Sequence, residues 1–172
     1  MKGKYIEQYK ALHKQKRYGI SGDSLVENLF SVADRQTTSV LDYGCGQSDT
    51  GTKLAAMLGT KVLCQYDPAV EGRDSPIKGK YYLCICTDVL EHIPEEELDK
   101  VFKDIIKHTD KEVIFVIALR EAAQILPNGE NAHCTVKPKE WWEDKLKTAF
   151  PGVNYIRIYS KPYYTAWFKC SV

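Results

Sequence analysis

Short apolar runs alternate with amphipathic stretches along most of the chain, a pattern typical of α/β proteins. The apolar runs of strand length lie at 39–42, 61–65, 81–87 and 113–119. The stretches with apolar residues at helical spacing lie at 5–16, 24–32, 50–58, 94–108 and 139–150. Because parallel strands are joined by long crossovers, usually helices, this order predicts a mostly parallel sheet with helices on both faces.

Glycine and proline mark the ends of several predicted elements. Gly59 is expected to end one helix in the left-handed conformation, and Pro94 and Pro138 are expected to begin two later helices. The last part of the sequence, 153–160 and 163–170, alternates between apolar and polar residues, as in a terminal antiparallel hairpin. We therefore predict a three-layer α/β sandwich with a mostly parallel sheet of about six strands and an antiparallel last strand.

The most informative segment is the first predicted strand with the loop that follows it. The apolar strand runs into Asp42-Tyr-Gly44-Cys-Gly46. Residues without a β-carbon let the backbone turn sharply and approach a ligand, so the two glycines predict a cofactor site at the carboxyl end of a strand. A dinucleotide-binding fingerprint requires a third glycine, where this chain has Asp49. The acid before the glycines instead suits a positively charged ligand without a pyrophosphate.

A second acid follows the next predicted strand. Asp67 lies 25 residues after Asp42, a spacing that fits a strand–helix–strand unit. The right-handed crossover of such a unit brings Asp67 beside the glycine loop, where a carboxylate can accept hydrogen bonds from both hydroxyls of a ribose. The alternative interpretation is a turn acid that precedes Pro68.

Three motifs together resemble a known family, the class I (Rossmann-like) S-adenosylmethionine-dependent methyltransferases. They are, in order, Asp42-Tyr-Gly44-Cys-Gly46, the acid Asp67, and the segment 81–92 with Asp88-Val-Leu-Glu91-His92. The resemblance covers about 40–119 and implies one methyltransferase domain over 1–172, with N-terminal helices in 1–35 and a Rossmann-like core in 36–172. It also implies that S-adenosylmethionine is the cofactor and that the cofactor-binding residues are Asp42, Gly44, Cys45, Gly46, Asp67, Pro68, Thr87 and Asp88.

The chain departs from the family pattern between Pro68 and Lys80. The family usually places a helix, a third strand and an adenine-binding acid there. This segment has 13 residues, and Gly72, Pro76 and Gly79 are among them. It is too short for a helix and a strand, so we expect the third strand to be missing.

A cluster of acids and histidines offers the candidate chemistry. If 88–93 makes one helical turn, Asp88, Glu91 and His92 share a face, and His133 lies on a later loop. The candidate catalytic residues are Asp88, His92 and His133. All four residues are candidate ligands of a divalent metal ion, which would lower the pKa of an acceptor hydroxyl. The pattern is similar to the metal-binding residues of small-RNA 3′-terminal ribose 2′-O-methyltransferases and of ubiquinone-synthesis O-methyltransferases. The alternative is a metal-free cluster that lines or supports the pocket.

Charge leaves the class of acceptor open. The net charge is +1, but residues 1–17 hold six Lys or Arg and one acid, and residues 155–172 hold three and none. Basic ends suit a nucleic-acid backbone, although such runs are more often solvated faces. The acceptor is therefore a small molecule or RNA or DNA.

The cysteines and the lengths of the apolar runs indicate the cellular environment in which the protein works. Its six cysteines contain no Cys-x-x-Cys pair and are interpreted as reduced core residues. No apolar run approaches the length of a membrane span, and the first residues lack the apolar core of a signal peptide. We expect a cytoplasmic protein without a membrane partner.

The predicted function is transfer of a methyl group from S-adenosylmethionine to an oxygen or nitrogen. The sequence lacks an Asn-Pro-Pro-Tyr-like motif and a Pro-Cys nucleophile, which argues against methylation of base amino groups or of carbon-5 of cytosine. Two alternatives remain open. One is a catalytically silent accessory subunit that binds S-adenosylmethionine, and the other is an enzyme that uses this cofactor for lyase chemistry.

Overall fold

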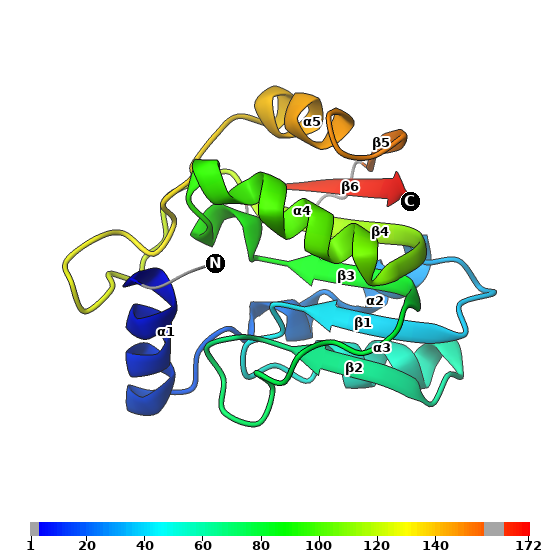
Figure 1. The fold of residues 1–172 in the computed structure, drawn as a ribbon, viewed down its shortest axis with the longest axis horizontal. Helices are drawn as coiled ribbons and strands as arrows, with labels where there is room; N and C mark the ends of the chain where they lie inside the picture. The colour runs from blue at the N-terminus through cyan, green and yellow to red at the C-terminus, as the bar shows by residue number, and fades with distance from the viewer. Residues whose placement is uncertain (1–3, 157–163) are drawn as a thin grey trace.

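A mixed β-sheet forms the centre of the computed structural model, which describes residues 4–156 and 164–172 (Figure 1). Within these residues its six strands are β1 (Ser39–Tyr43), β2 (Val62–Tyr66), β3 (Tyr81–Thr87), β4 (Thr109–Ala118), β5 (Gly152–Ile156) and β6 (Thr165–Ser171). The helices are α1 (Lys4–Gln15), α2 (Val26–Val32), α3 (Thr50–Leu58), α4 (Leu98–Lys107) and α5 (Lys139–Lys147), with short 3₁₀ turns η1 (Ser21–Ser24), η2 (Leu90–His92) and η3 (Glu95–Glu97). None of these helices is long and apolar enough to cross a membrane.

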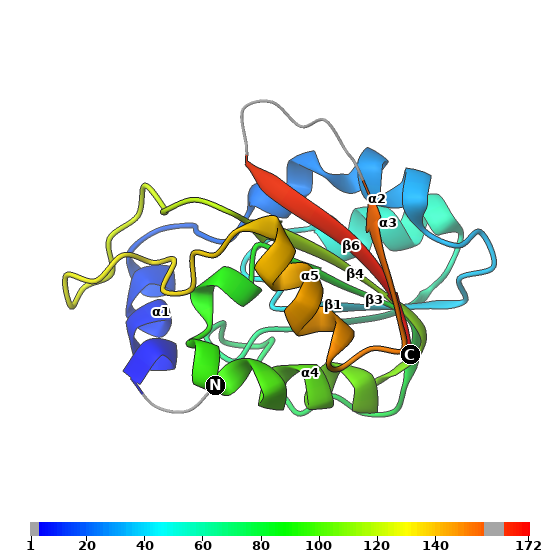
Figure 2. The ribbon, with the colours of Figure 1, turned by 90° about the horizontal axis from the view of Figure 1, so that it is seen from above.

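Two helical layers cover the sheet. Helices α2 and α3 pack on one face and α4 and α5 on the other, as Figure 2 shows. Successive strand residues belong to opposite faces, so Val40 packs with the first pair of helices and Leu41 with the second. Helix α1 stands apart from both layers, at the end of the sheet to which β1 and β3 point (Figure 1).

The strand order explains where a ligand can bind. It is β2-β1-β3-β4-β6-β5, with parallel pairing from β2 to β4 and antiparallel pairing of β6 with both β4 and β5. From β1 the chain crosses to β2 on one side, and it then returns to β3 on the other. The carboxyl ends of β1 and β3 therefore form a topological switch point, where open α/β sheets usually bind ligands.

The predicted loss of the third strand is confirmed. Residues 67–80, all of them described, contain no strand, which leaves β2 at the edge of the sheet. The segment is tied to the glycine loop by Arg73, whose Nη1 donates to the carbonyl oxygens of Gly46 (2.9 Å) and Ser48 (2.8 Å). The carbonyl of Arg73 also accepts a hydrogen bond from the amide of Asp67 (2.9 Å).

The other predicted elements agree with the structure apart from their limits. Gly59 ends α3 with a φ of 72°, β4 begins four residues before its predicted start at 113, and α5 ends three residues before its predicted end at 150. The predicted hairpin at the end of the sequence is present as the antiparallel pair β5 and β6. Its predicted turn, within 157–163, lies outside the described residues.

Asp42 connects the sheet to helix α3. Its Oδ2 accepts a hydrogen bond from the amide of Gly51 (2.9 Å), in the first turn of that helix. A β-carbon at Gly51 would lie 2.8 Å from this carboxylate, so the helix approaches the strand more closely than a larger residue permits. The carboxyl group is 1% exposed, and this burial raises the pKa of Asp42 to about 7.

We predict that Asp42 makes the protein less stable as the pH rises from about 4 to about 7. The folded state, with a pKa of about 7, binds the proton more tightly than the unfolded state, with a pKa of 3.8. This group therefore lowers the free energy of unfolding by up to ~1.4 kcal/mol per pH unit in that window. Urea denaturation at several pH values should show this component in the wild type and not in Asp42→Asn. Equal pH dependence in the two proteins would contradict the assignment.

Candidate functional site

A cavity of about 490 Å³ lies at the switch point. Its floor consists of the carboxyl ends of the parallel strands and the loops that follow them. Its roof comes from α1 and the segment that connects α1 to α2. The residues that face it from these two sides include Tyr43, Gly44, Gly46, Tyr66, Asp67, Pro68 and Asp88 below and Tyr9, His13, Arg17, Tyr18, Gly19 and Ser21 above.

The roof segment packs directly on the glycine loop. The amide of Tyr18 donates to Oε1 of Gln47 (2.9 Å), and the amide of Gln47 donates to the carbonyl of Tyr18 (3.3 Å). A β-carbon at Gly46 would lie 2.5 Å from the carbonyl oxygen of Gly19. Gly46 is therefore required by the packing of one chain segment on another.

Gly44 has a similar packing role. A β-carbon there would lie 2.5 Å from Val89, which follows β3. The sequence had suggested that both glycines make room for a ligand. In the structure they line the cavity, but the atoms that exclude a larger side chain belong to the protein itself.

Asp67 lies beside the glycine loop, as the crossover predicted. Its Oδ2 accepts a hydrogen bond from the amide of Gly46 (2.9 Å), and its Oδ1 accepts one from the amide of Ala69 (2.8 Å). Each carboxylate oxygen has a further lone pair, so the group can accept two more hydrogen bonds from a ligand in the cavity.

The predicted cofactor-binding residues separate into two groups. Gly44, Gly46, Asp67, Pro68 and Asp88 line the cavity. The cavity lining does not include Asp42, Cys45 or Thr87. Of these, Cys45 is buried, which raises the pKa of its thiol, and its sulfur lies 3.6 Å from Nη1 of Arg73.

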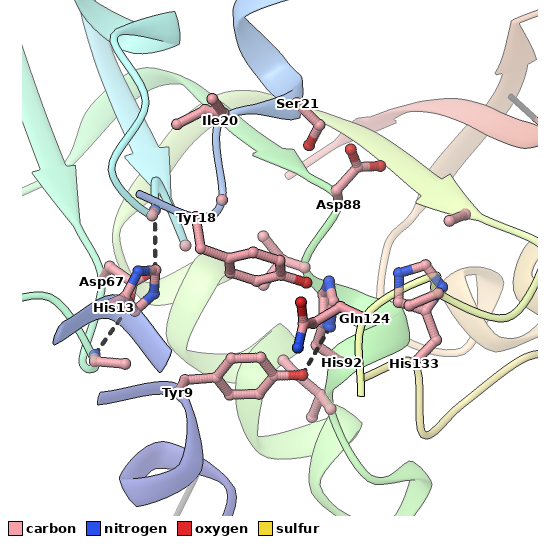
Figure 3. Close-up of a pocket in the computed structure, with 18 of the residues that line it drawn as sticks. Tyr9, His13, Tyr18, Ile20, Ser21, Asp67, Asp88, His92, Gln124 and His133 are labelled. Carbon is pink, nitrogen blue, oxygen red and sulfur yellow. Dashed lines mark hydrogen bonds between the residues drawn. The ribbon is translucent and has the colours of Figure 1, made fainter. Parts of the chain in front are cut away.

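The helical turn considered over 88–93 is present only as the 3₁₀ turn Leu90–His92 and does not include Asp88. Asp88 has a left-handed conformation with a φ of 53°, and the following 3₁₀ turn begins at Leu90. The amide of Asp88 donates to the carbonyl of Val116 (2.8 Å), which continues the pairing of β3 with β4. This conformation is strained for a residue with a side chain and directs the carboxylate toward Ser21 (Figure 3).

The surroundings of Asp88 therefore differ from those of the two histidines. Burial raises the pKa of its carboxyl group, while a hydrogen bond from the Ser21 hydroxyl opposes that shift. In Figure 3, Asp88 lies beside Ser21 on one side of the cavity, and His92 and His133 lie together on another.

Three of the four candidate metal ligands converge. Glu91, His92 and His133 each offer one ligand atom, and these atoms lie within 4.8 Å of one another. The rings of His92 and His133 meet edge to face with centroids 4.6 Å apart, and Nε2 of His133 lies 4.0 Å from Oε1 of Glu91. Among the described residues, the group of converging ligand atoms does not include Asp88.

Hydrogen bonding determines which nitrogen of each imidazole carries the proton. Nδ1 of His92 lies 2.9 Å from the carbonyl oxygen of Ala132 and 2.8 Å from the hydroxyl of Tyr9. Because that hydroxyl already donates to the same carbonyl (2.7 Å), Nδ1 must carry a hydrogen. Nδ1 of His133 lies 2.6 Å from the carbonyl oxygen of Arg120 and carries a hydrogen, because a carbonyl oxygen can only accept. Both Nε2 atoms therefore keep a lone pair.

Burial keeps both histidines neutral. It lowers the pKa of His92 to about 3, with a further contribution from the charge of His133, and it also lowers the pKa of His133. A neutral imidazole whose Nδ1–H binds a carbonyl is the form in which histidine ligates metals through Nε2.

Glu91 completes the group with an unsatisfied oxygen. Its Oε1 accepts a hydrogen bond from the amide of Ala118 (3.0 Å). Its Oε2 is buried and has no hydrogen-bond partner among the described residues. Burial, followed by the charge of Asp88, raises the pKa of Glu91 well above its ordinary value. Burying an oxygen without a hydrogen-bond partner costs free energy. We therefore expect Oε2 of Glu91 to bind a proton or a cation.

Sequence reasoning missed the polar role of Tyr9 in α1. Its ring is buried, as expected of an aromatic residue on the apolar side of the helix predicted over 5–16. The hydroxyl of Tyr9, however, connects α1 to His92 and Ala132. No local pattern reveals a hydrogen bond between residues 123 positions apart.

Comparison with known proteins gives matches at the level of structure. No protein-family model matches the chain, and no curated protein matches its sequence. Magnesium protoporphyrin IX methyltransferase (ChlM) from Synechocystis PCC 6803, with bound SAH, matches with 17% identity and a TM-score of 0.57, over 99% of this chain and 88% of that one.

Two further solved structures are similar. The 1,6-didemethyltoxoflavin-N1-methyltransferase of Burkholderia thailandensis, with 1,6-didemethyltoxoflavin and S-adenosylhomocysteine bound, has 13% identity and a TM-score of 0.65, over 97% of this chain and 84% of that one. A putative O-methyltransferase from Nostoc punctiforme has 12% identity and a TM-score of 0.62, over 98% and 60%. The chain therefore has the Rossmann-like fold of the class I S-adenosylmethionine-dependent methyltransferases.

Proposed function

We propose that the protein transfers a methyl group from S-adenosylmethionine to an oxygen or nitrogen of a small acceptor. The observation that carries this proposal is that one cavity contains two kinds of site. Asp67 lies beside the glycine loop in one part of the cavity wall. His92 and His133 line another part, and Glu91 lies buried behind these two histidines. The fold shared with methyltransferases whose structures contain S-adenosylhomocysteine supports the assignment.

The glycine loop and Asp67 form the cofactor end. Bound S-adenosylmethionine supplies an activated methyl group, so the chain has to hold, align and desolvate the reactants. Asp67 accepts hydrogen bonds from the ribose hydroxyls, while Gly44, Gly46, Pro68 and Asp88 form the walls. Three of the predicted cofactor-binding residues do not line the cavity and instead support the conformation of the glycine loop and its strands: Asp42, Cys45 and Thr87.

The residues at the other end fit a divalent metal ion. Two neutral imidazoles, each with an Nε2 lone pair, and a carboxylate with an unpartnered oxygen make a donor set that suits Mn²⁺, Fe²⁺ or Zn²⁺. Glu91, His92 and His133 would hold the ion, whose charge lowers the pKa of an acceptor hydroxyl. Asp88, directed toward Ser21, stays outside this ligand set.

The histidines also suggest a mechanism without a metal ion, in which an imidazole removes the proton of the acceptor. Without an ion, Nε2 of His133 accepts a proton from the acceptor as a general base. Burial lowers the pKa of His92 to about 3, which makes that ring too weak a base for this role, so His133 is the better candidate of the two.

The roof favours a small acceptor over a nucleic acid. Helix α1 lies across the cavity, and Tyr9 fastens it to His92 and Ala132. One of the similar structures holds a small heterocyclic compound, 1,6-didemethyltoxoflavin. A covered cavity admits such a compound more readily than a folded RNA or a DNA duplex.

Mass spectrometry should separate this function from its alternatives. We expect that the protein, S-adenosylmethionine and a small-molecule extract together yield S-adenosylhomocysteine and a methylated compound. Breakdown of S-adenosylmethionine without an acceptor would favour lyase chemistry, and tight binding without turnover would favour a silent subunit. Turnover that requires added RNA or DNA would overturn the small-acceptor assignment.

Removal of the Asp67 carboxylate should weaken cofactor binding. Asp67→Ala loses the acceptors for the ribose hydroxyls. One hydrogen bond to a charged group contributes ~1.5–3 kcal/mol, so the loss of even one such bond should weaken S-adenosylhomocysteine binding by roughly 10- to 100-fold, as measured by calorimetry. Asp74→Ala, an exposed acid on the same segment, is the matched control and should bind like the wild type. Unchanged affinity in a folded Asp67→Ala protein would contradict the assigned role.

Metal binding can be tested without an acceptor. We expect calorimetry to show Mn²⁺ binding to the wild type and at least tenfold weaker binding to Glu91→Gln and His133→Ala. His108→Ala is the control, because the His108 ring bonds to the carbonyl of Gly79 and does not line the cavity. A chelator should leave S-adenosylhomocysteine affinity unchanged. If the wild type gives no Mn²⁺ signal, the ion is rejected and the general-base alternative stands.

A further inference from the structure

The roof of the cavity carries a hydroxyl group that the protein does not use. The Tyr18 side chain lines the cavity, and the hydrogen bonds that Tyr18 makes to described residues come from its main chain. Its hydroxyl oxygen is not among the described side-chain atoms that are fully buried without a partner, so it has accessible surface. A polar atom that faces a cavity without a protein partner is available to a ligand.

Contacts with the roof and with the loop after β1 hold Tyr18 in place. Its amide and its carbonyl both bond to Gln47 of that loop. Its ring lies beside the imidazole of His13, with centroids 5.9 Å apart, and Nζ of Lys16 lies 5.9 Å from the ring centre. These contacts limit the positions that the ring can take and so give its hydroxyl a defined direction.

The hydroxyl reaches the end of the cavity at which the histidines lie. Figure 3 shows it pointing toward His92. Burial raises the pKa of Tyr18 to about 12, and the charges of Glu91 and Asp88 contribute to this shift, which agrees with a hydroxyl that lies close to both acids. The group is therefore protonated at pH 7 and can donate a hydrogen bond at the acceptor end.

The polar groups at this end suit an acceptor with two polar atoms. Nε2 of His92 and Nε2 of His133 each have a lone pair, so they accept a hydrogen bond or bind an ion. In both versions of the proposed mechanism, these nitrogens serve the atom that is methylated. The Tyr18 hydroxyl can serve a second atom of the same compound, and because it points toward His92, the two atoms must lie near each other.

We propose that Tyr18 binds the acceptor by donating a hydrogen bond to a carbonyl oxygen, a ring nitrogen or a similar atom next to the atom that is methylated. This inference rests on the proposed function and adds the chemical class of the acceptor. The acceptor is a compound in which a hydrogen-bond-accepting atom neighbours the nucleophilic oxygen or nitrogen. Its remainder is apolar, since Ile93, Val101 and Ala118 also line the cavity.

Removal of the hydroxyl tests this contact. Tyr18→Phe keeps the ring and should keep the wild-type melting temperature, because the hydroxyl has no protein partner. With S-adenosylmethionine and a dilute small-molecule extract, we expect roughly 3- to 10-fold slower formation of methylated compound, as for the loss of one neutral hydrogen bond. S-adenosylhomocysteine affinity should stay unchanged. Tyr155→Phe, which alters an exposed tyrosine outside the cavity lining, is the matched control and should react like the wild type.

A dilution series of the extract separates binding from catalysis. Loss of a contact with the acceptor should raise the apparent KM, in units of extract dilution, more than it lowers kcat. A loss of S-adenosylhomocysteine affinity that equals the loss of turnover would assign Tyr18 to the cofactor and overturn the inference. Equal turnover in Tyr18→Phe and the wild type would reject only the role of Tyr18. A wild type that forms no methylated compound would reject the proposed function itself.

The structure of the methylated compound gives an independent check. Mass spectrometry and NMR of the product should show a carbonyl oxygen, a ring nitrogen or a similar hydrogen-bond acceptor beside the methylated atom. A product without any such atom beside the new methyl group would contradict the proposed class of acceptor.

Discussion

The close approach of the backbone at Gly19 to the backbone at Gly46 is the constraint on which the site depends. It leaves no room for a β-carbon at Gly46 and brings the segment after α1 into contact with the loop after β1. The reciprocal bonds between Tyr18 and Gln47 hold the same two segments in register. Because of this contact, the N-terminal helix becomes a wall of the cavity and its side chains face the ends of the strands.

The parts of the fold that follow from local patterns could be predicted from the sequence. Apolar runs located the central strands, the 25-residue spacing placed Asp67 beside the glycine loop, and the short interval 68–80 showed that a strand was missing. The left-handed conformation of Asp88 and the bond from its amide to Val116 of another strand could not be predicted, because no local pattern shows either one. The packing constraint on Gly44 and Gly46 could not be predicted, because the residues that leave no room for a β-carbon there come from distant segments.

Burial is the main cause of the pKa shifts of Asp88, Glu91, His92 and His133. Desolvation raises the pKa of Asp88 and Glu91 and lowers the pKa of His92 and His133, so all four groups shift toward their neutral forms. A neutral cluster tolerates a low-dielectric cavity without a counter-ion. Backbone carbonyls bind Nδ1 of both His92 and His133 and so fix the orientation of the two rings. Nε2 of each ring therefore keeps a lone pair for a ligand.

The hydroxyl of Tyr9 has a consequence for the order in which the protein is assembled. It joins α1 to the turn after β3 and to a loop that is synthesised more than 100 residues later. Closing such a long loop carries an entropic cost that only the nearly complete fold repays, so contacts of this kind form late in folding. A nascent chain that has formed β1 to β3 therefore has a glycine loop and Asp67 but no finished cavity. The cavity is therefore complete only in the fully folded molecule.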